Sequence, residues 1–466
     1  MAKNDSKGPG ISTRSFLTAI IVIFCLMVVS FILGNTIPGG SYARIRNVSG
    51  EFILYTAAGF RTVSGGISFK EWILSPILVL NAPGSGSLIA VIAFLLVIGG
   101  IFSSLDHCGL MKYMLQRTVH RFGGVRWRLM AVTSLLFMAM GAMIGSFEEV
   151  VPLVPIVTAL AVSLGWDPLT GIGMSLLAAG CGFAAGVCNP FTVGVAQQLA
   201  ELPMFSGAWL RVLSFVLIWT LLFTFLRRHA KKIERPSDTS AASDFVPDKK
   251  MDRALGCFGG VLGGGIVLVF CSAFLPFLRD FTMIIVAVTF LAAGLIAAPM
   301  SGMSAGKLAK TFFRGVVTIL PAVVMILMAS SIKYTLEEAR VLDTILHKAV
   351  QLAGTLPDWS VILFIYLVVM VMNFFIPSGS AKAFMLIPLI VPLAQIFGIS
   401  PQLCIVAFAF GDGFSNAFYP TNPVLLISLG LVDVSYGDWF RWSGKFQLMN
   451  ILLTSGILLF GLAVGY

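Results

Sequence analysis

Apolar runs of about 20 residues recur along the whole chain, and this feature limits the folds that the chain can adopt. A run of this length with few charges can cross about 30 Å of hydrocarbon as an α-helix. Hydrophobic residues make up 58% of the 466 residues and charged residues only 11%, whereas about 25% charged residues is usual for soluble domains. The sequence therefore predicts an all-α polytopic membrane protein.

We predict nine spanning segments and two helical hairpins. The spans are 16–36, 85–104, 169–200, 208–226, 255–277, 281–299, 312–332, 401–430 and 446–465, and the hairpins are 129–165 and 362–398. Basic residues precede the first span, but its apolar run is longer than that of a signal peptide and no small-residue cleavage site follows it. We therefore expect the first span to remain as an anchor.

Basic residues cluster beside the spans, and these clusters account for the formal net charge of +10. Lys and Arg next to a span usually mark its cytoplasmic end. Two such clusters fall in 105–128 and 227–235. We therefore predict an inner-membrane protein with a cytoplasmic amino terminus, surrounded by lipid and with no nucleic-acid partner.

An internal repeat divides the chain into two halves. The recurring residues keep spacings of 13 and 22 residues and an offset of 233; they are Pro155, Pro168 and Asn189-Pro190 in the first half and Pro388, Pro401 and Asn422-Pro423 in the second. We predict a first repeat over 1–228, a polar cytoplasmic linker over 229–252 and a second repeat over 253–466. Each repeat holds one hairpin and one broken helix.

The two repeats are expected to have inverted topology. Span 281–299 has no clear partner in the first half, where the segment 37–84 is expected outside the membrane instead. This one additional crossing reverses the orientation of the second repeat in the membrane. The equivalent connectors differ in charge accordingly, because 105–128 is strongly basic whereas 333–358 has no basic excess. This difference is typical of inverted repeats.

The two hairpin tips carry polar and charged side chains that hydrocarbon does not tolerate without a partner or a function. We select them as candidates for substrate binding or ion coupling: Ser146, Glu148 and Glu149 in the first tip, and Ser378, Ser380 and Lys382 in the second. The alternative is an ordinary hairpin whose polar turn reaches water on the far side and binds nothing.

Glycine and proline interrupt the two spans that follow the hairpins. We predict helix breaks at Gly182, Gly186, Pro190, Gly411, Gly413 and Pro423. A broken helix offers unpaired backbone groups and dipole ends to a ligand. The polar side chains expected to join them are Asn189, Asp412, Ser415, Asn416, Thr421 and Asn422. The alternative is a kink that only allows close packing.

The charges at these places suggest the chemistry of the solute. If both tips meet near the middle of the membrane, three carboxylates and one ammonium face a shared pocket, those of Glu148, Glu149, Asp412 and Lys382. Such a pocket suits a small molecule with both a cationic group and a carboxylate, which describes an amino acid, preferably a basic one. Lys382 could equally form a structural ion pair with a carboxylate.

At these residues the sequence resembles the YfcC family, relatives of the anaerobic four-carbon dicarboxylate carriers within the ion transporter superfamily. The resemblance covers essentially the whole chain and is most specific over 145–155, 378–392 and 411–423. It implies a secondary active transporter with a scaffold domain and a transport domain, re-entrant hairpins, an elevator-type mechanism and a homodimer. The names used in the family include basic amino acid antiporters and dicarboxylate carriers.

The hairpin tips depart from the Ser-Asn-Thr motif that lies near bound sodium in this superfamily, since they read Ser146-Phe147-Glu148 and Ser378-Gly379-Ser380. Sodium and protons both remain candidates for the coupling ion, and no other cofactor is expected. The candidate sodium position is near Ser146, Asn189, Ser380 and Asn422. The acidic first tip favours exchange or co-transport of a basic amino acid. The alternative is a four-carbon dicarboxylate or another small carboxylate, coupled to sodium or protons.

Two other functional classes fit less well. Ser330-x-x-Lys333 matches a serine/lysine hydrolase pattern, but Lys333 ends a predicted span, where a lysine usually reaches for the interface. The sequence contains no HExxH, its four histidines all lie in connectors, and its one GxSxG match, at 302–306, lies in a connector between two predicted spans. A channel would not need two paired hairpins. We therefore expect a transporter and not an enzyme.

Overall fold

The structure confirms a polytopic membrane protein built from helices. The computed structural model describes residues 13–46, 52–83, 85–122, 125–145, 147–233, 247–272 and 282–466. Within these residues, eight helices are long and apolar enough to cross a membrane. Every predicted span and hairpin contains helix, although the end of the span 255–277 and most of the linker 229–252 lie outside the described residues.

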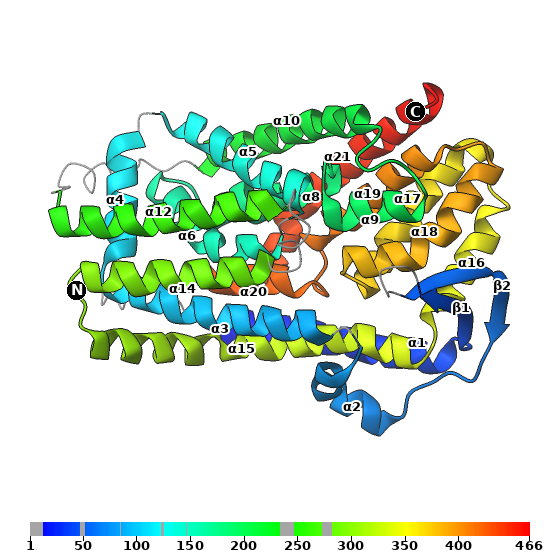
Figure 1. Cartoon of the computed structure of the whole chain (residues 1–466), viewed down its shortest axis with the longest axis horizontal. Coiled ribbons are helices and arrows are strands. Elements are labelled where there is room, and N and C mark those ends of the chain that lie inside the picture. The colour runs from blue at the N-terminus through cyan, green and yellow to red at the C-terminus, as the bar shows by residue number, and fades with distance from the viewer. Residues whose placement is uncertain are drawn as a thin grey trace.

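Five helices form a layer along one side of the molecule, which we call the helix layer. They pack in the order α12 (Lys249–Ser272), α14 (Thr282–Met300), α3 (Ser85–His107), α15 (Ala305–Glu338) and α1 (Thr13–Thr36) (Figure 1). Glycines allow α3 and α15 to approach closely, because a Cβ on Gly315 would lie 2.2 Å from the carbonyl oxygen of Gly99. Small residues commonly serve this purpose where membrane helices cross.

The remaining long helices form a second body, which we call the hairpin body. Its first half contains α5 (Arg126–Ile144), η3 (Glu148–Leu153), α6 (Val154–Ser163), α7 (Pro168–Ile172), η4 (Gly173–Leu177), α8 (Ala178–Ala185), η5 (Pro190–Gly194), α9 (Val195–Leu199) and α10 (Ala208–Ile233). Its second half contains α17 (Asp358–Phe375), α18 (Gly379–Ile396), α19 (Pro401–Asn416), α20 (Pro423–Leu431) and α21 (Tyr436–Ala463). The helix α5 packs on α8, and α17 packs on α19.

The two hairpins lie toward opposite ends of the molecule. In Figure 1, α5 and α6 lie in the half that contains α4 (Leu110–Phe122), whereas α17 and α18 lie in the half that contains α16 (Leu342–Ala353). The amphipathic connectors α4 and α16 are therefore at opposite ends as well.

A two-stranded sheet forms in the segment that we placed outside the membrane. Strands β1 (Gly40–Arg46) and β2 (Phe52–Thr62) pair antiparallel, and α2 (Phe69–Leu78) and η1 (Val79–Asn81) follow. The sheet is fixed to α16, because Arg44 forms an ion pair with Asp343 at 3.0 Å and the Tyr42 hydroxyl lies 2.8 Å from His347 Nδ1. It also contacts α18, one arm of the second hairpin.

The first broken helix is interrupted between α8 and η5. The helix α8 ends at Gly186, whose φ of +51° is a left-handed conformation that glycine adopts at little cost. Asn189 then caps the next segment, because its Oδ1 accepts hydrogen bonds from the amides of Phe191 at 2.9 Å and Thr192 at 3.3 Å. Proline follows at the first helical position, where its missing N–H is not needed.

The second broken helix uses the same capping device. The helix α19 ends at Asn416, and α20 begins after Asn422, whose Oδ1 accepts a hydrogen bond from the Val424 amide at 2.9 Å. Pro423 occupies the first helical position. Both Asn-Pro pairs therefore start a new helix after a non-helical gap. Each span is interrupted there, whereas the alternative that we considered was a kink in a continuous helix.

Three of the predicted helix breaks are wrong. Gly182 lies inside α8, and Gly411 and Gly413 lie inside α19, which is continuous to Asn416. These glycines instead permit close helix crossings, since a Cβ would lie 1.8 Å from the Met138 carbonyl oxygen at Gly182 and 2.3 Å from Ala184 Cα at Gly413. The interruptions themselves fall at Gly186, Pro190 and Pro423.

Candidate substrate and ion site

A buried ion pair joins the second hairpin to the second broken helix. Lys382 lies near the start of α18 and Asp412 lies in α19, and both side chains are fully buried. Lys382 Nζ is 2.5 Å from Asp412 Oδ1. Buried charges lose their hydration, so such a pair persists only where the surroundings satisfy its remaining polar atoms.

Two further oxygens complete the surroundings of the Lys382 ammonium. Its Nζ donates to the carbonyl oxygen of Ile376 at 2.8 Å and makes a short hydrogen bond to Asn373 Oδ1. The Ile376 carbonyl is available because α17 ends at Phe375 and Ile376 is not helical. The ammonium therefore donates to two oxygens, and the Asp412 carboxylate balances its charge.

The side chain of Asn373 is held in one orientation by α19. Its Nδ2 lies 3.0 Å from the Asp412 carbonyl oxygen, 2.6 Å from Ser415 Oγ and 3.0 Å from Asn416 Oδ1. Asn416 Oδ1 also accepts from Asn422 Nδ2 at 3.0 Å. Three residues predicted for the site, Ser415, Asn416 and Asn422, thus belong to one buried network. Asn373 was missed, although it is a polar residue within the apolar run of the hairpin.

The second hairpin tip also meets the first broken helix. A Cβ on Gly379 would lie 2.6 Å from Thr192 Cγ2 and 2.7 Å from Asp412 Oδ2, so only glycine fits there. Among the described residues, Asp412 Oδ2 and Thr192 Oγ1 have no hydrogen-bond partner. The carboxylate of Asp412 therefore pairs with Lys382 through Oδ1, while its Oδ2 lies beside Gly379.

The first hairpin tip lies against the first Asn-Pro break. Gly145 has a φ of +78°, and a Cβ there would lie 2.4 Å from Asn189 Oδ1. The amide of Cys188 donates to the carbonyl oxygen of Ala142 at 3.0 Å. The first tip therefore packs directly against the first Asn-Pro break. Ser146 lies outside the described residues.

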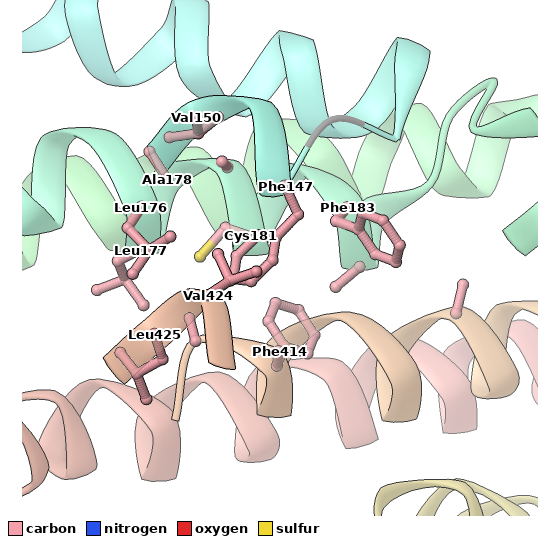
Figure 2. Packing of buried hydrophobic residues seen from close by; sticks show 14 of the residues in the cluster. Phe147, Val150, Leu176, Leu177, Ala178, Cys181, Phe183, Phe414, Val424 and Leu425 are labelled. Atoms are coloured by element: carbon pink, nitrogen blue, oxygen red, sulfur yellow. The ribbon is translucent and has the colours of Figure 1, made fainter. Parts of the chain in front are cut away.

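The acidic residues of the first tip do not join Lys382 in the described contacts. Phe147 is buried and packs near Phe183 and Phe414 between the two broken helices (Figure 2). Glu148 is exposed on the protein surface, and Glu149 faces a small cavity toward α12 and α14. Of the three carboxylates expected around Lys382, only that of Asp412 contacts it.

A cavity of about 150 Å³ separates the second tip and break from the helix layer. From the hairpin body it is lined by Phe375, Pro377, Ser378, Thr421 and Pro423, and from α15 its polar lining comes from Ser330, Lys333, Tyr334 and Glu337. Lys333 Nζ is 3.3 Å from Glu337 Oε1, and both side chains are partly exposed, 31% and 42%. Thr421 Oγ1 has no hydrogen-bond partner among the described residues.

The sequence interpretation missed the charged residues of this cavity. It assigned Lys333 to the end of a span, whereas α15 continues to Glu338 and holds Lys333 and Glu337 one turn apart. Ser378 and Thr421 are the predicted residues that line the cavity, and Ser380 follows, half-buried, in the first turn of α18. The spacing i, i+4 of opposite charges was the signal that could have found this pair.

Another charged residue that the sequence interpretation left out is fully buried. The side chain of Arg211 on α10 donates to the carbonyl oxygens of Val187 at 3.3 Å and Phe205 at 3.1 Å. Val187 lies within the first break, so Arg211 fixes the backbone of that interruption. Its bonds to backbone carbonyls give it a structural role beside the break.

Comparison with known proteins identifies the family. The family model of the C4-dicarboxylate anaerobic carriers, DcuC, matches residues 16–464. The chain belongs to this family. As a member of a carrier family with eight candidate membrane spans, it is a membrane transporter.

Two curated relatives align with most of the chain. One is the "Putative basic amino acid antiporter YfcC" of Escherichia coli K12, which is 27% identical over 401 residues, 82% of this chain and 79% of that protein. The other is an uncharacterized protein of Haemophilus influenzae, 25% identical over 388 residues, 81% of this chain and 75% of that protein. These relatives agree with the YfcC resemblance seen in the sequence.

Two solved transporters share a remote structural likeness with the chain. The YdaH transporter of Alcanivorax borkumensis has a TM-score of 0.44 and 18% identity, and covers 97% of this chain and 99% of its own. MtrF of Neisseria gonorrhoeae has a TM-score of 0.43 and 15% identity, and covers 98% and 95%. At this similarity we draw no functional conclusion from either structure.

Proposed function

We propose that this transporter carries an amino acid, preferably a basic one, across the inner membrane by exchange or co-transport. The observation that supports this proposal is the cavity between the hairpin body and α15. It contains one cationic and one anionic side chain, those of Lys333 and Glu337, next to the hydroxyls of Ser378 and Thr421. An amino acid carries the two complementary charges.

The charge of the cavity favours an amino acid over a dicarboxylate. Lys333 can bind the substrate carboxylate and Glu337 its ammonium, because their mutual ion pair is partly exposed and contributes little by itself. A dicarboxylate would bring two negative charges to a lining whose formal charges cancel, and the charge of Lys382 is already matched by Asp412. The name of the E. coli relative, a basic amino acid antiporter, agrees with this choice.

We propose that the hairpin body moves against the helix layer in an elevator-type mechanism. The cavity lies at the boundary between these two bodies, so a displacement along that boundary would carry a bound molecule with the second tip. The inverted repeats and the re-entrant course of the hairpins belong to this proposal and are supported by the placement of α5–α6 and α17–α18 at opposite ends (Figure 1). The homodimer that the resemblance implies remains a prediction.

The inverted topology predicts opposite accessibility of α4 and α16. In a variant without the seven native cysteines, we would introduce Lys112→Cys on α4 or Lys348→Cys on α16, at positions that are exposed in the structure. A membrane-impermeant maleimide should label the cysteine at 348 in spheroplasts, and the cysteine at 112 only after permeabilisation. Labelling of both from one side contradicts inversion and the cytoplasmic amino terminus.

The substrate proposal predicts selective exchange in proteoliposomes. The purified protein should exchange radiolabelled arginine or lysine against the same internal solute, and should not exchange succinate. Glu337→Gln should lower arginine exchange about ten-fold or more, since a lost charge-assisted contact costs about 1.5–3 kcal/mol. Initial rates of counterflow measure both effects.

The adjacent residue Glu338 gives a matched control. It is exposed on the same helix and is not part of the cavity lining, so Glu338→Gln should leave exchange unchanged. Exchange of succinate without exchange of any amino acid would establish the dicarboxylate alternative. Equal losses in both glutamate variants would show that the effect is not specific to the cavity.

A further inference from the structure

The oxygens around Lys382 are of the kind that bind a metal cation. They are a carboxylate oxygen of Asp412, the amide oxygen of Asn373 and the backbone carbonyl oxygen of Ile376. Hard cations such as Na⁺ take ligands of these three types, often from non-helical backbone. In this protein all three oxygens surround a single ammonium group that belongs to the chain itself.

The geometry leaves this cluster complete with Lys382 in it. Asn373 Nδ2 is held by three acceptors of α19, so its oxygen is directed at Nζ. The ammonium has hydrogen-bond acceptors in Asn373 and Ile376 and its counter-ion in Asp412. The ammonium therefore takes the place that a small cation would have among these ligands.

Charge excludes a second cation in the same cluster. Lys382 and Asp412 are both fully buried, and together their formal charges cancel. An added Na⁺ would leave an uncompensated positive charge in a fully buried region, where an unpaired charge is very costly. These three oxygens therefore do not fit sodium as long as Lys382 occupies the cluster.

We propose that the Lys382 ammonium is a tethered substitute for a coupling metal cation, so that the second hairpin and broken helix are held in register without Na⁺ or K⁺. One consequence of this inference rests on the proposed function: transport should need no alkali cation at this tip. Cation binding by the cluster itself can be measured on the purified protein, whatever the substrate is.

The test removes the Lys382 ammonium by mutation and supplies a free cation in solution. The thermal unfolding of Lys382→Ala in detergent is followed in NaCl, LiCl, KCl and choline chloride at equal ionic strength. We expect Na⁺ or Li⁺ to raise the Tm of this variant by at least about 2 °C over choline, because a cation that binds only the folded state stabilises it. Wild-type protein should show no such difference.

Two further variants make the test decisive. Lys382→Ala/Asp412→Ala lacks the anionic ligand and should lose the response to Na⁺, whereas Lys382→Gln provides a second single variant if the alanine variant does not fold. A folded single variant with the same Tm in Na⁺ and choline overturns the proposal. The proposal is also overturned if Na⁺ raises the Tm of the wild type and this response is lost in Asp412→Ala.

Transport separates this inference from the proposed function. Exchange of arginine by the wild type should continue at an unchanged rate when choline replaces Na⁺ on both sides, and loss of exchange in choline would contradict the tethered cation. If no amino acid is exchanged, the proposed function fails, but the Tm responses still decide whether the cluster binds cations.

Discussion

Asp412→Ala should unfold far more easily than the wild type and should not transport. Removal of this carboxylate leaves the Lys382 ammonium fully buried without its counter-ion. Removing one partner of a buried ion pair typically costs about 3–5 kcal/mol, because the remaining charge stays in a region of low dielectric constant. The free energy of unfolding, from chemical denaturation in detergent, and substrate exchange in proteoliposomes measure the two effects.

The double variant Asp412→Ala/Lys382→Met should recover much of the lost stability, since it buries neither charge. It should not recover transport, because the second tip no longer has an ion pair that links α18 to α19. Asp358→Ala is the surface control. It removes an exposed carboxylate at the start of α17 and should change stability by less than about 1 kcal/mol. If the single and double variants are equally unstable, lost packing and not the unpaired charge is the cause.

The sequence was most informative about the helices. A segment that spans hydrocarbon needs about 20 apolar residues whatever it packs against, so the length of each run predicts a helix directly. The span predicted over 281–299 corresponds to α14, Thr282–Met300. The span predicted over 208–226 starts at the same residue as α10, Ala208. The Asn-Pro pairs were equally readable, because asparagine followed by proline is a local start signal for a helix.

The partners of the charged residues were not predictable in the same way. Lys382 pairs with Asp412, which lies on a different helix and is brought near by the packing of α17, α18 and α19. From the sequence, Glu148 and Glu149 were expected to face Lys382 if the two tips met near the middle of the membrane. At the first tip, however, the chain forms a 3₁₀ turn after the buried Phe147, and Glu149 faces α12 and α14 instead.

The role of the glycines also depended on tertiary packing. Glycine breaks a helix or permits a close crossing, and the sequence does not distinguish the two uses. Gly186 has a left-handed conformation and ends α8, whereas Gly182, four residues earlier, keeps helical geometry and faces α5. Likewise β1 packs against α16 and pairs with it through Arg44 and Asp343, a tertiary contact that the hydrophobic pattern does not contain.

Gly182→Ala should have one of the largest effects of any single added methyl group in this protein. The new Cβ would lie 1.8 Å from the Met138 carbonyl oxygen, far inside contact distance, so α5 and α8 would have to separate. Overpacking of this kind usually costs about 1–3 kcal/mol, and occasionally more. We expect a loss in the upper part of that range, measured as the free energy of unfolding in detergent.

Transport should fall together with stability in Gly182→Ala, because α8 positions the break at Gly186 and the cap at Asn189 against the first tip. Gly263→Ala on α12 is the matched control. It is also a glycine within a membrane helix, but a Cβ there meets nothing within 4 Å. Alanine should be neutral there or stabilise the helix by about 0.5–1 kcal/mol. Equal behaviour of the two variants would mean that the close crossing of α5 and α8 does not hold the first break in place.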